Sequence, residues 1–246
     1  MTDRKTDWSR VIAVTNRGLC GGDFYEQIRK VCVLGVKAVI LREKDLSPED
    51  YAGMAERVLR ICEEEGTVCI LHTFWREAEK LGCGNLHLPL PVLEEMRQEE
   101  RRLSGTRQEE VQLSVSENPI KEKEISISGA ENPADAEKRM FFSEAEAGNR
   151  TGSLQNCWKI LGCSAHSLEQ AARAQELGAT YLTAGHIFAT GCKPGVPPRG
   201  LDFLREICEN AAVPVYAIGG IDEDNMQQAL DAGAAGVCMM SQMMRL

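Results

Sequence analysis

The chain has 246 residues, of which 43% are hydrophobic and 26% are charged, a composition that excludes a disordered or fibrous protein. Its formal net charge of -9 at pH 7 argues against nucleic-acid binding, because affinity for a phosphate backbone requires an excess of lysine and arginine. The N-terminus is polar and no stretch approaches the roughly 18 apolar residues of a membrane span, so we expect a soluble cytoplasmic protein without a membrane partner.

Eight short apolar runs recur along the chain and alternate for the most part with longer amphipathic segments. The runs predict buried β-strands at 11–14, 38–41, 68–71, 85–88, 159–162, 181–184, 213–218 and 236–239. Segments with a helical period lie at 24–34, 47–65, 167–177, 201–210 and 222–232. Strands that are apolar on both faces and alternate with helices predict a parallel sheet covered by helices.

The number of these units predicts an α/β fold of the (β/α)8 or TIM barrel class, formed as a single domain over residues 10–246. An open doubly wound sheet is the structural alternative. We prefer the barrel because a phosphate-type loop follows the seventh apolar run, and barrels bind phosphate after their seventh and eighth strands.

Two segments depart from the repeat. Residues 94–156 become polar and rich in Glu, Ser, Asn and Arg, which predicts a short helix followed by a long disordered insertion without a chemical role. The residues after the last apolar run, 240–246, are too few for a closing helix, so we expect that helix to be absent or reduced to a turn.

A pair of glycines follows the seventh predicted strand. Gly219 and Gly220 allow the backbone to approach a ligand closely, and we expect a helix to begin near Asp222, so this turn is a candidate anion site. The backbone of Met240 and the hydroxyl of Ser241, after the eighth strand, could complete a phosphate-binding site. The alternative interpretation is a tight turn without a ligand.

Cationic and imidazole side chains follow two other predicted strands. Arg42 and Lys44 share one side of an extended segment and could face an anionic substrate, or form a solvated basic pair. His186 directly follows the sixth strand and precedes a glycine-containing loop with Thr190 and Lys193. A histidine at the mouth of a barrel can transfer protons near neutral pH, although an isolated histidine is more often structural.

Several segments together resemble the superfamily of thiamine phosphate synthase and thiazole tautomerase, in order and spacing and over nearly the whole chain outside the insertion. These segments are Leu41-Arg-Glu-Lys44, Gly162-Cys-Ser-Ala-His-Ser167, Gly185-His-Ile-Phe-Ala-Thr-Gly-Cys-Lys193, Arg199-Gly-Leu201 and Val213-Pro-Val-Tyr-Ala-Ile-Gly-Gly-Ile221.

The chain departs from the synthase pattern at its metal-binding positions. The sequence pattern of the synthase has Asn-Asp after the third strand and a segment of the type Gly-Gln-x-Asp after the fourth. At the matching positions this chain has His72-Thr73 and the segment 88–91 (Leu-Pro-Leu-Pro). Ile40 also replaces a glutamine of that pattern. Because carboxylates hold the Mg²⁺ that assists the departure of diphosphate, the loss of these carboxylates disfavours a diphosphate-releasing transferase.

Residues 185–193 resemble the tautomerase branch of the superfamily. They match its pattern, Gly-His-x-Phe-x-Thr-x-Cys-Lys, at every named position.

The resemblance implies a thiazole tautomerase-like isomerase of thiamine biosynthesis that needs no cofactor and no metal. It implies that His186 moves a proton on a thiazole carboxylate phosphate, that Arg42 and Lys44 hold the carboxylate, and that the two turns after strands seven and eight hold the phosphate. Residues with a further substrate-binding role would be His72, which replaces an asparagine of that branch, and Ser164, Thr190 and Lys193. We expect His87 and His166 to be structural.

Two other functions stay open at this point. One is a divergent thiamine phosphate synthase, a transferase that would join hydroxymethylpyrimidine diphosphate to thiazole phosphate and would require Mg²⁺. The other is a regulatory protein that binds a thiazole phosphate without turnover. A homo-oligomer is also left open.

Overall fold

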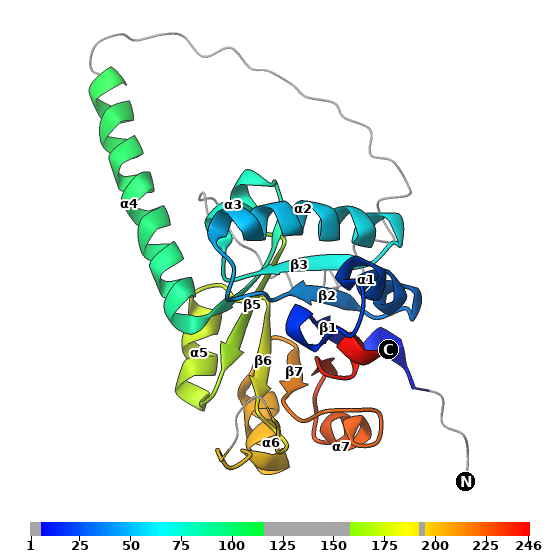
Figure 1. The fold of residues 1–246 in the computed structure, drawn as a ribbon. Helices are drawn as coiled ribbons and strands as arrows, with labels where there is room; N and C mark the ends of the chain where they lie inside the picture. Colours follow the sequence, from blue (N-terminus) through cyan, green and yellow to red (C-terminus); the bar gives the residue numbers. More distant parts are fainter. Residues whose placement is uncertain (1–5, 116–157, 192–194) are drawn as a thin grey trace, which may run out of the picture. The chain divides into compact units, whose positions relative to one another are not determined.

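The computed structural model describes residues 6–115, 158–191 and 195–246, with the side chains of 104–115 excepted. Its eight strands are all parallel and pair in chain order, with β1 closing onto β8, so that they form a barrel (Figure 1). The predicted (β/α)8 fold is confirmed. The strands are β1 (Val11–Val14), β2 (Ala38–Leu41), β3 (Val68–His72), β4 (Asn85–Pro89), β5 (Ile160–Ala165), β6 (Tyr181–Gly185), β7 (Val215–Ile218) and β8 (Gly236–Met239).

Most strand residues are buried, and this explains why the apolar runs locate the strands so well. In β1, β2 and β8 all residues are buried, because one face packs inside the barrel and the other packs under the helices. Four strands extend further than the apolar runs indicate, among them β4, which reaches Pro89, and β6, which reaches Gly185. β3 includes His72, and β5 continues through Ser164 to Ala165, so Ser164 lies within a strand instead of beyond it.

Helices of the barrel unit lie on the outside of the strands, as Figure 1 shows. Side chains of Asp23, Ser47 and Ser167 cap the helices that follow them by accepting hydrogen bonds from backbone N–H groups of the first turn. These helices are α1 (Phe24–Val33), α2 (Pro48–Glu64), α3 (Trp75–Lys80), α5 (Leu168–Glu176), α6 (Gly200–Asn210) and α7 (Met226–Asp231).

Two helices differ from the expectation. The six-residue helix α3 was not among the predicted segments, because it is too short to show a helical period. Helix α7 begins at Met226 and not near Asp222, because the Asp222 carboxylate accepts hydrogen bonds from the backbone N–H groups of Asp224 and Asn225 and holds a turn there.

The chain divides into two compact units, 1–95 with 157–246, and 96–156. The first contains the barrel. Helix α4 (Leu90–Val115) begins in the first unit and is much longer than the short helix expected at the start of the polar segment. Its sequence is rich in Glu, Gln, Arg and Leu, which are strong helix formers. The rest of the predicted disordered insertion, 116–156, lies outside the described residues.

The segment after β8 contains a single 3-10 turn, Met243–Arg245, in agreement with the expected loss of the closing helix. Both methionines of this turn are buried. Among the described helices, none has the length and apolar character required to span a membrane.

Candidate active site

A cavity of about 510 Å³ opens among the ends of the strands and the loops that follow them. It belongs entirely to the barrel unit. Every predicted site residue that the structure describes lines this cavity: Arg42, Lys44, His72, Ser164, His186, Thr190, Gly219, Gly220, Met240 and Ser241. Lys193 lies outside the described residues, as does Cys192 of the same motif. The tertiary structure thus brings together residues from six different strand ends.

His186 lies directly after β6 and is 6% exposed. Its Nε2 atom is 3.3 Å from the carbonyl oxygen of Val196. Its Nδ1 atom is buried and has no hydrogen-bond partner among the described residues. An unsatisfied buried nitrogen is costly in a folded protein, and such an atom beside a cavity indicates a ligand as its partner.

The glycine turn after β7 packs against the segment that carries His186. Gly219 and Gly220 have φ angles of +101° and +67°. A Cβ atom on Gly219 would lie 2.3 Å from the Cβ of His186, and one on Gly220 would lie 2.2 Å from the carbonyl oxygen of Ala189. The backbone N–H of Phe188 donates to the carbonyl of Gly219 at 2.9 Å. Only glycine fits here, and the turn therefore positions His186 whether or not it also binds an anion.

The candidate phosphate site depends on backbone amides and not on a helix terminus. Helix α7 begins six residues after Gly220 and is only six residues long, so its N-terminus does not contribute as expected. Within the described residues, no hydrogen bond uses the backbone N–H of Gly219, Gly220 or Ser241. The three residues line the cavity just after the neighbouring strands β7 and β8, where unbonded backbone N–H groups suit an anion.

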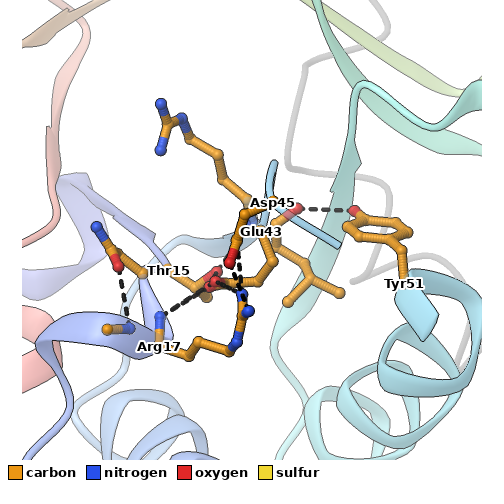
Figure 2. A network of polar contacts seen from close by, with 9 residues as sticks. Thr15, Arg17, Glu43, Asp45 and Tyr51 are labelled. Carbon is orange, nitrogen blue, oxygen red and sulfur yellow. Dashed lines mark hydrogen bonds and ion pairs between the residues drawn. The ribbon is translucent and has the colours of Figure 1, made fainter. Parts of the chain in front are cut away.

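After β2, two cationic side chains line the cavity, whereas the carboxylate between them in sequence does not. Arg42 and Lys44 both line the cavity, but the segment is not extended as expected, because Lys44 lies in a turn. Glu43 is 3% exposed and turns instead toward Thr15 and Arg17, as Figure 2 shows. The Arg42 guanidinium has no ion-pair partner among the described residues.

Neutral polar groups form the floor of the cavity. His87 is 3% exposed, and its two ring nitrogens each lie 2.9 Å from a hydroxyl, that of Tyr181 and that of Ser164. Burial, with a smaller contribution from Lys44 and Arg42, lowers the pKa of His87 to about 3. Burial and the neighbouring His87 also hold the pKa of His72 well below its usual value. Both imidazoles are therefore uncharged at neutral pH.

Residues that we did not predict as ligands also line the cavity, among them His87, His166 and Thr183. The expected structural role of the first two agrees with their hydrogen bonds, since His166 Nδ1 contacts the carbonyl of Gly185 at 2.7 Å. A signal for His87 was present in the sequence. It lies between Leu86 and Leu88, both fully buried, and a polar residue flanked by apolar ones in a barrel strand faces the interior.

The donor set of the cavity does not suit a divalent metal. Among its described lining residues the one carboxylate is Asp222, and an oxygen of that group already accepts two backbone N–H groups. No cluster of three or more His, Cys, Asp or Glu side chains with metal-binding geometry occurs in the described part of the chain. Mg²⁺ prefers carboxylate and phosphate oxygens.

Comparisons with known proteins agree with this architecture. The thiamine-phosphate synthase of Fusobacterium nucleatum is 26% identical over 233 residues, which cover 94% of this chain and 87% of that protein. That of Coprothermobacter proteolyticus is 44% identical over 82 residues, 33% of this chain and 39% of that one. A solved structure of a thiamine phosphate pyrophosphorylase from Pyrococcus furiosus superimposes with a TM-score of 0.62 at 22% identity, covering 96% and 87% of the two chains.

A family model described as thiamine monophosphate synthase matches residues 11–117 and 151–243, which include all eight strands and every lining residue of the cavity. The chain therefore belongs to the thiamine monophosphate synthase family.

Proposed function

We propose that this protein is an isomerase of thiamine biosynthesis that converts a non-aromatic thiazole carboxylate phosphate to its aromatic tautomer, with His186 as the group that moves the proton. The observation that carries the proposal is the buried and unpartnered Nδ1 atom of His186 beside the cavity. A proton shift needs one such base and neither a leaving group nor a metal.

The surroundings of His186 assign its protons. A carbonyl oxygen can only accept, so the contact with Val196 places a hydrogen on Nε2 of the neutral ring. Nδ1 is then the basic nitrogen. In the reaction it takes a proton from a ring carbon, the electrons of that C–H bond shift to form the aromatic system, and the imidazolium returns the proton to a second carbon. Substrate and product have the same composition and charge.

Two groups of residues suit the two anionic ends of such a substrate. The Arg42 guanidinium, with Lys44 beside it, suits a carboxylate, because a guanidinium presents two parallel N–H groups to the two oxygens. The backbone N–H groups of Gly219, Gly220 and Ser241 suit a phosphate. His72, Ser164 and Thr190 would contact the ring between these ends, and we include Lys193 on the motif alone.

A second candidate is a thiamine-phosphate synthase, because the relatives carry that name. Those names favour the transferase over the isomerase, whereas the side chains of the cavity favour the isomerase. Release of diphosphate requires that its charge be neutralised, and the described lining residues do not fit the Mg²⁺ that this family member would use. The synthase is therefore our second proposal and not the first.

The deciding experiment assays the purified full chain for both reactions. We expect aromatisation of the thiazole carboxylate phosphate in the presence of EDTA, and no thiamine phosphate from the two precursors with Mg²⁺. Replacement His186→Gln should lower the isomerisation rate by about 100-fold or more while the affinity for inorganic phosphate stays the same. Mg²⁺-dependent synthase turnover would establish the second candidate, and equal rates for wild type and His186→Gln would remove His186 from the mechanism.

A further inference from the structure

We infer that Glu43 is a positioning residue that sets the carboxylate specificity of the cavity by holding Arg42 and Lys44 in place. The inference rests on the proposed function, since it concerns the end of the cavity assigned to the substrate carboxylate. Glu43 does not line the cavity itself, although both of its sequence neighbours do.

The Glu43 carboxylate is buried and fully engaged. One oxygen accepts from the Thr15 hydroxyl at 2.7 Å and from the backbone N–H of Arg17 at 3.0 Å. The other accepts from the Arg17 guanidinium at 3.0 Å and lies 3.2 Å from the same backbone N–H (Figure 2). A carboxylate at 3% exposure is tolerated because donors from the segment after β1 surround it.

The hydroxyl of Thr15 connects Glu43 to the backbone of Arg42. A carboxylate can only accept and a backbone N–H can only donate, so each hydrogen in this contact has one allowed position. The Thr15 hydroxyl donates to Glu43, and its oxygen accepts from the backbone N–H of Arg42 at 2.9 Å. Thr15 is fully buried, and its own backbone N–H donates to the carbonyl of Ile40 at 3.0 Å. Thr15 thereby ties the segment that follows β1 to the end of β2 at three residues, Ile40, Arg42 and Glu43.

This tie determines where the two cations lie. Glu43 is held on the side of Thr15 and Arg17, whereas its two sequence neighbours, Arg42 and the turn residue Lys44, line the cavity. The anchoring also prevents Glu43 from neutralising its neighbours. Its negative charge is paired with Arg17, which is shared with the exposed carboxylate of Asp45. The Arg42 charge thus stays available to a ligand.

The test compares two carboxylate-to-amide changes that share the partner Arg17. Glu43→Gln removes the buried negative charge and replaces one of the two acceptor oxygens by an NH2 donor, whereas the control Asp45→Asn changes a side chain that is 70% exposed and contacts neither Thr15 nor the Arg17 backbone. Titration calorimetry would measure the binding of two probes to the full chain, a thiazole carboxylate phosphate and the thiazole phosphate that lacks the carboxylate. The ratio of the two dissociation constants reports the carboxylate contact alone.

For Glu43→Gln we expect the dissociation constant of the carboxylate-bearing probe to rise about tenfold and that of the carboxylate-free probe to stay unchanged. For Asp45→Asn we expect both constants to change by less than about twofold. A merely structural role would lower the melting temperature and weaken both probes alike. Parallel weakening of both probes, or equal effects of the two variants, would overturn the inference.

A second pair of variants keeps the inference testable if Glu43→Gln does not fold. Thr15→Val preserves the shape of the side chain and removes the hydroxyl, while Thr15→Ser retains the hydroxyl. We expect the valine variant to lose affinity for the carboxylate-bearing probe only, and the serine variant to restore it. Identical constants for both variants would contradict the tie between Thr15 and Arg42.

Arg42→Met separates failure of this inference from failure of the proposed function. If that variant binds the two probes as the wild type does, the carboxylate does not lie at this end of the cavity, and the proposed substrate orientation is wrong. If Arg42→Met weakens only the carboxylate-bearing probe and Glu43→Gln does not, the proposed function stands and the positioning role of Glu43 is wrong.

Discussion

The two ends of the cavity hold their functional side chains by different means. At the β2 end, a network of side chains around Glu43 orients Arg42 and Lys44. At the β6 to β7 end, the backbone holds His186 in place. Gly219 packs against the Cβ of His186, and the backbone N–H groups of the two residues after His186 donate to carbonyl groups at the end of β7. A side-chain network sets charge and affinity, whereas backbone packing sets the position of a reacting atom. The two ends should therefore respond to different perturbations.

The largest expected effect comes from adding one carbon atom at the backbone-held end. Gly219→Ala would place a Cβ 2.3 Å from that of His186 at a φ of +101°. We expect an isomerisation rate about 100-fold lower, because a displacement of about 1 Å is enough to misalign a base. Unfolding in urea should show a loss of roughly 1–3 kcal/mol.

A matched control for that prediction is Gly53→Ala in helix α2, where a Cβ would meet no atom within 4 Å. We expect an unchanged rate and a gain of up to about 1 kcal/mol in the free energy of unfolding. A wild-type rate for Gly219→Ala would show that the turn does not position His186.

The next largest effect concerns Arg42 at the β2 end of the cavity. Arg42→Met keeps most of the side-chain length and removes the guanidinium, so a carboxylate in the cavity loses a charged hydrogen bond worth about 1.5–3 kcal/mol. The Michaelis constant should rise about tenfold or more, while the rate at saturation changes little. Arg205→Met, which alters an exposed side chain of α6 paired with Asp202, serves as control and should leave both constants as they are. A fall in the saturated rate of Arg42→Met without a change in the Michaelis constant would mean that the two ends do not divide position and affinity.

A smaller effect on stability tests His87, which lies on the floor of the cavity between the two ends. Burial lowers the pKa of His87 to about 3, below the value near 6.5 of the unfolded chain, so between these values the unfolded state binds the extra proton. Stability is therefore retained above pH 6.5 and declines as the pH falls, by about 1.4 kcal/mol between pH 7.5 and pH 5.5 for this group alone. His72 acts in the same direction. Urea unfolding at the two pH values, compared between wild type and His87→Gln, measures the contribution, and an identical pH dependence in the variant would disprove it.

The smallest expected effect is that of salt, which distinguishes the two ends of the cavity without a mutation. Raising the ionic strength from about 0.05 to about 0.5 M screens charges that solvent reaches. We expect the Michaelis constant to rise about threefold and the rate at saturation to stay constant, because proton transfer at His186 involves no exposed charge. Steady-state kinetics at two salt concentrations decide this, and a salt-dependent saturated rate would argue against the division.

Some of the site could be anticipated and some could not. His186, Gly219 and Arg42 were identified because each directly follows a strand whose apolar run is unmistakable, and the ends of parallel strands meet at one rim. The role of Glu43 could not be predicted, because a carboxylate between two cations gives no sign of its own direction until Thr15 and Arg17, which follow β1, approach it. The hydrogen-bond partners of His87 could not be predicted, because the two hydroxyl groups are 77 and 94 residues away in sequence.

The sequence was enough to determine the alternation of strands and helices, because burial on both faces of a strand leaves a continuous apolar run, whereas the structure showed that the sheet closes into a barrel. The tertiary structure alone decided which polar groups meet. Pairing of β1 with β2 brings Thr15 to Glu43, and pairing of β6 with β7 brings His186 to Gly219, since hydrogen bonds and close contacts depend on distances in space that separation in sequence does not encode.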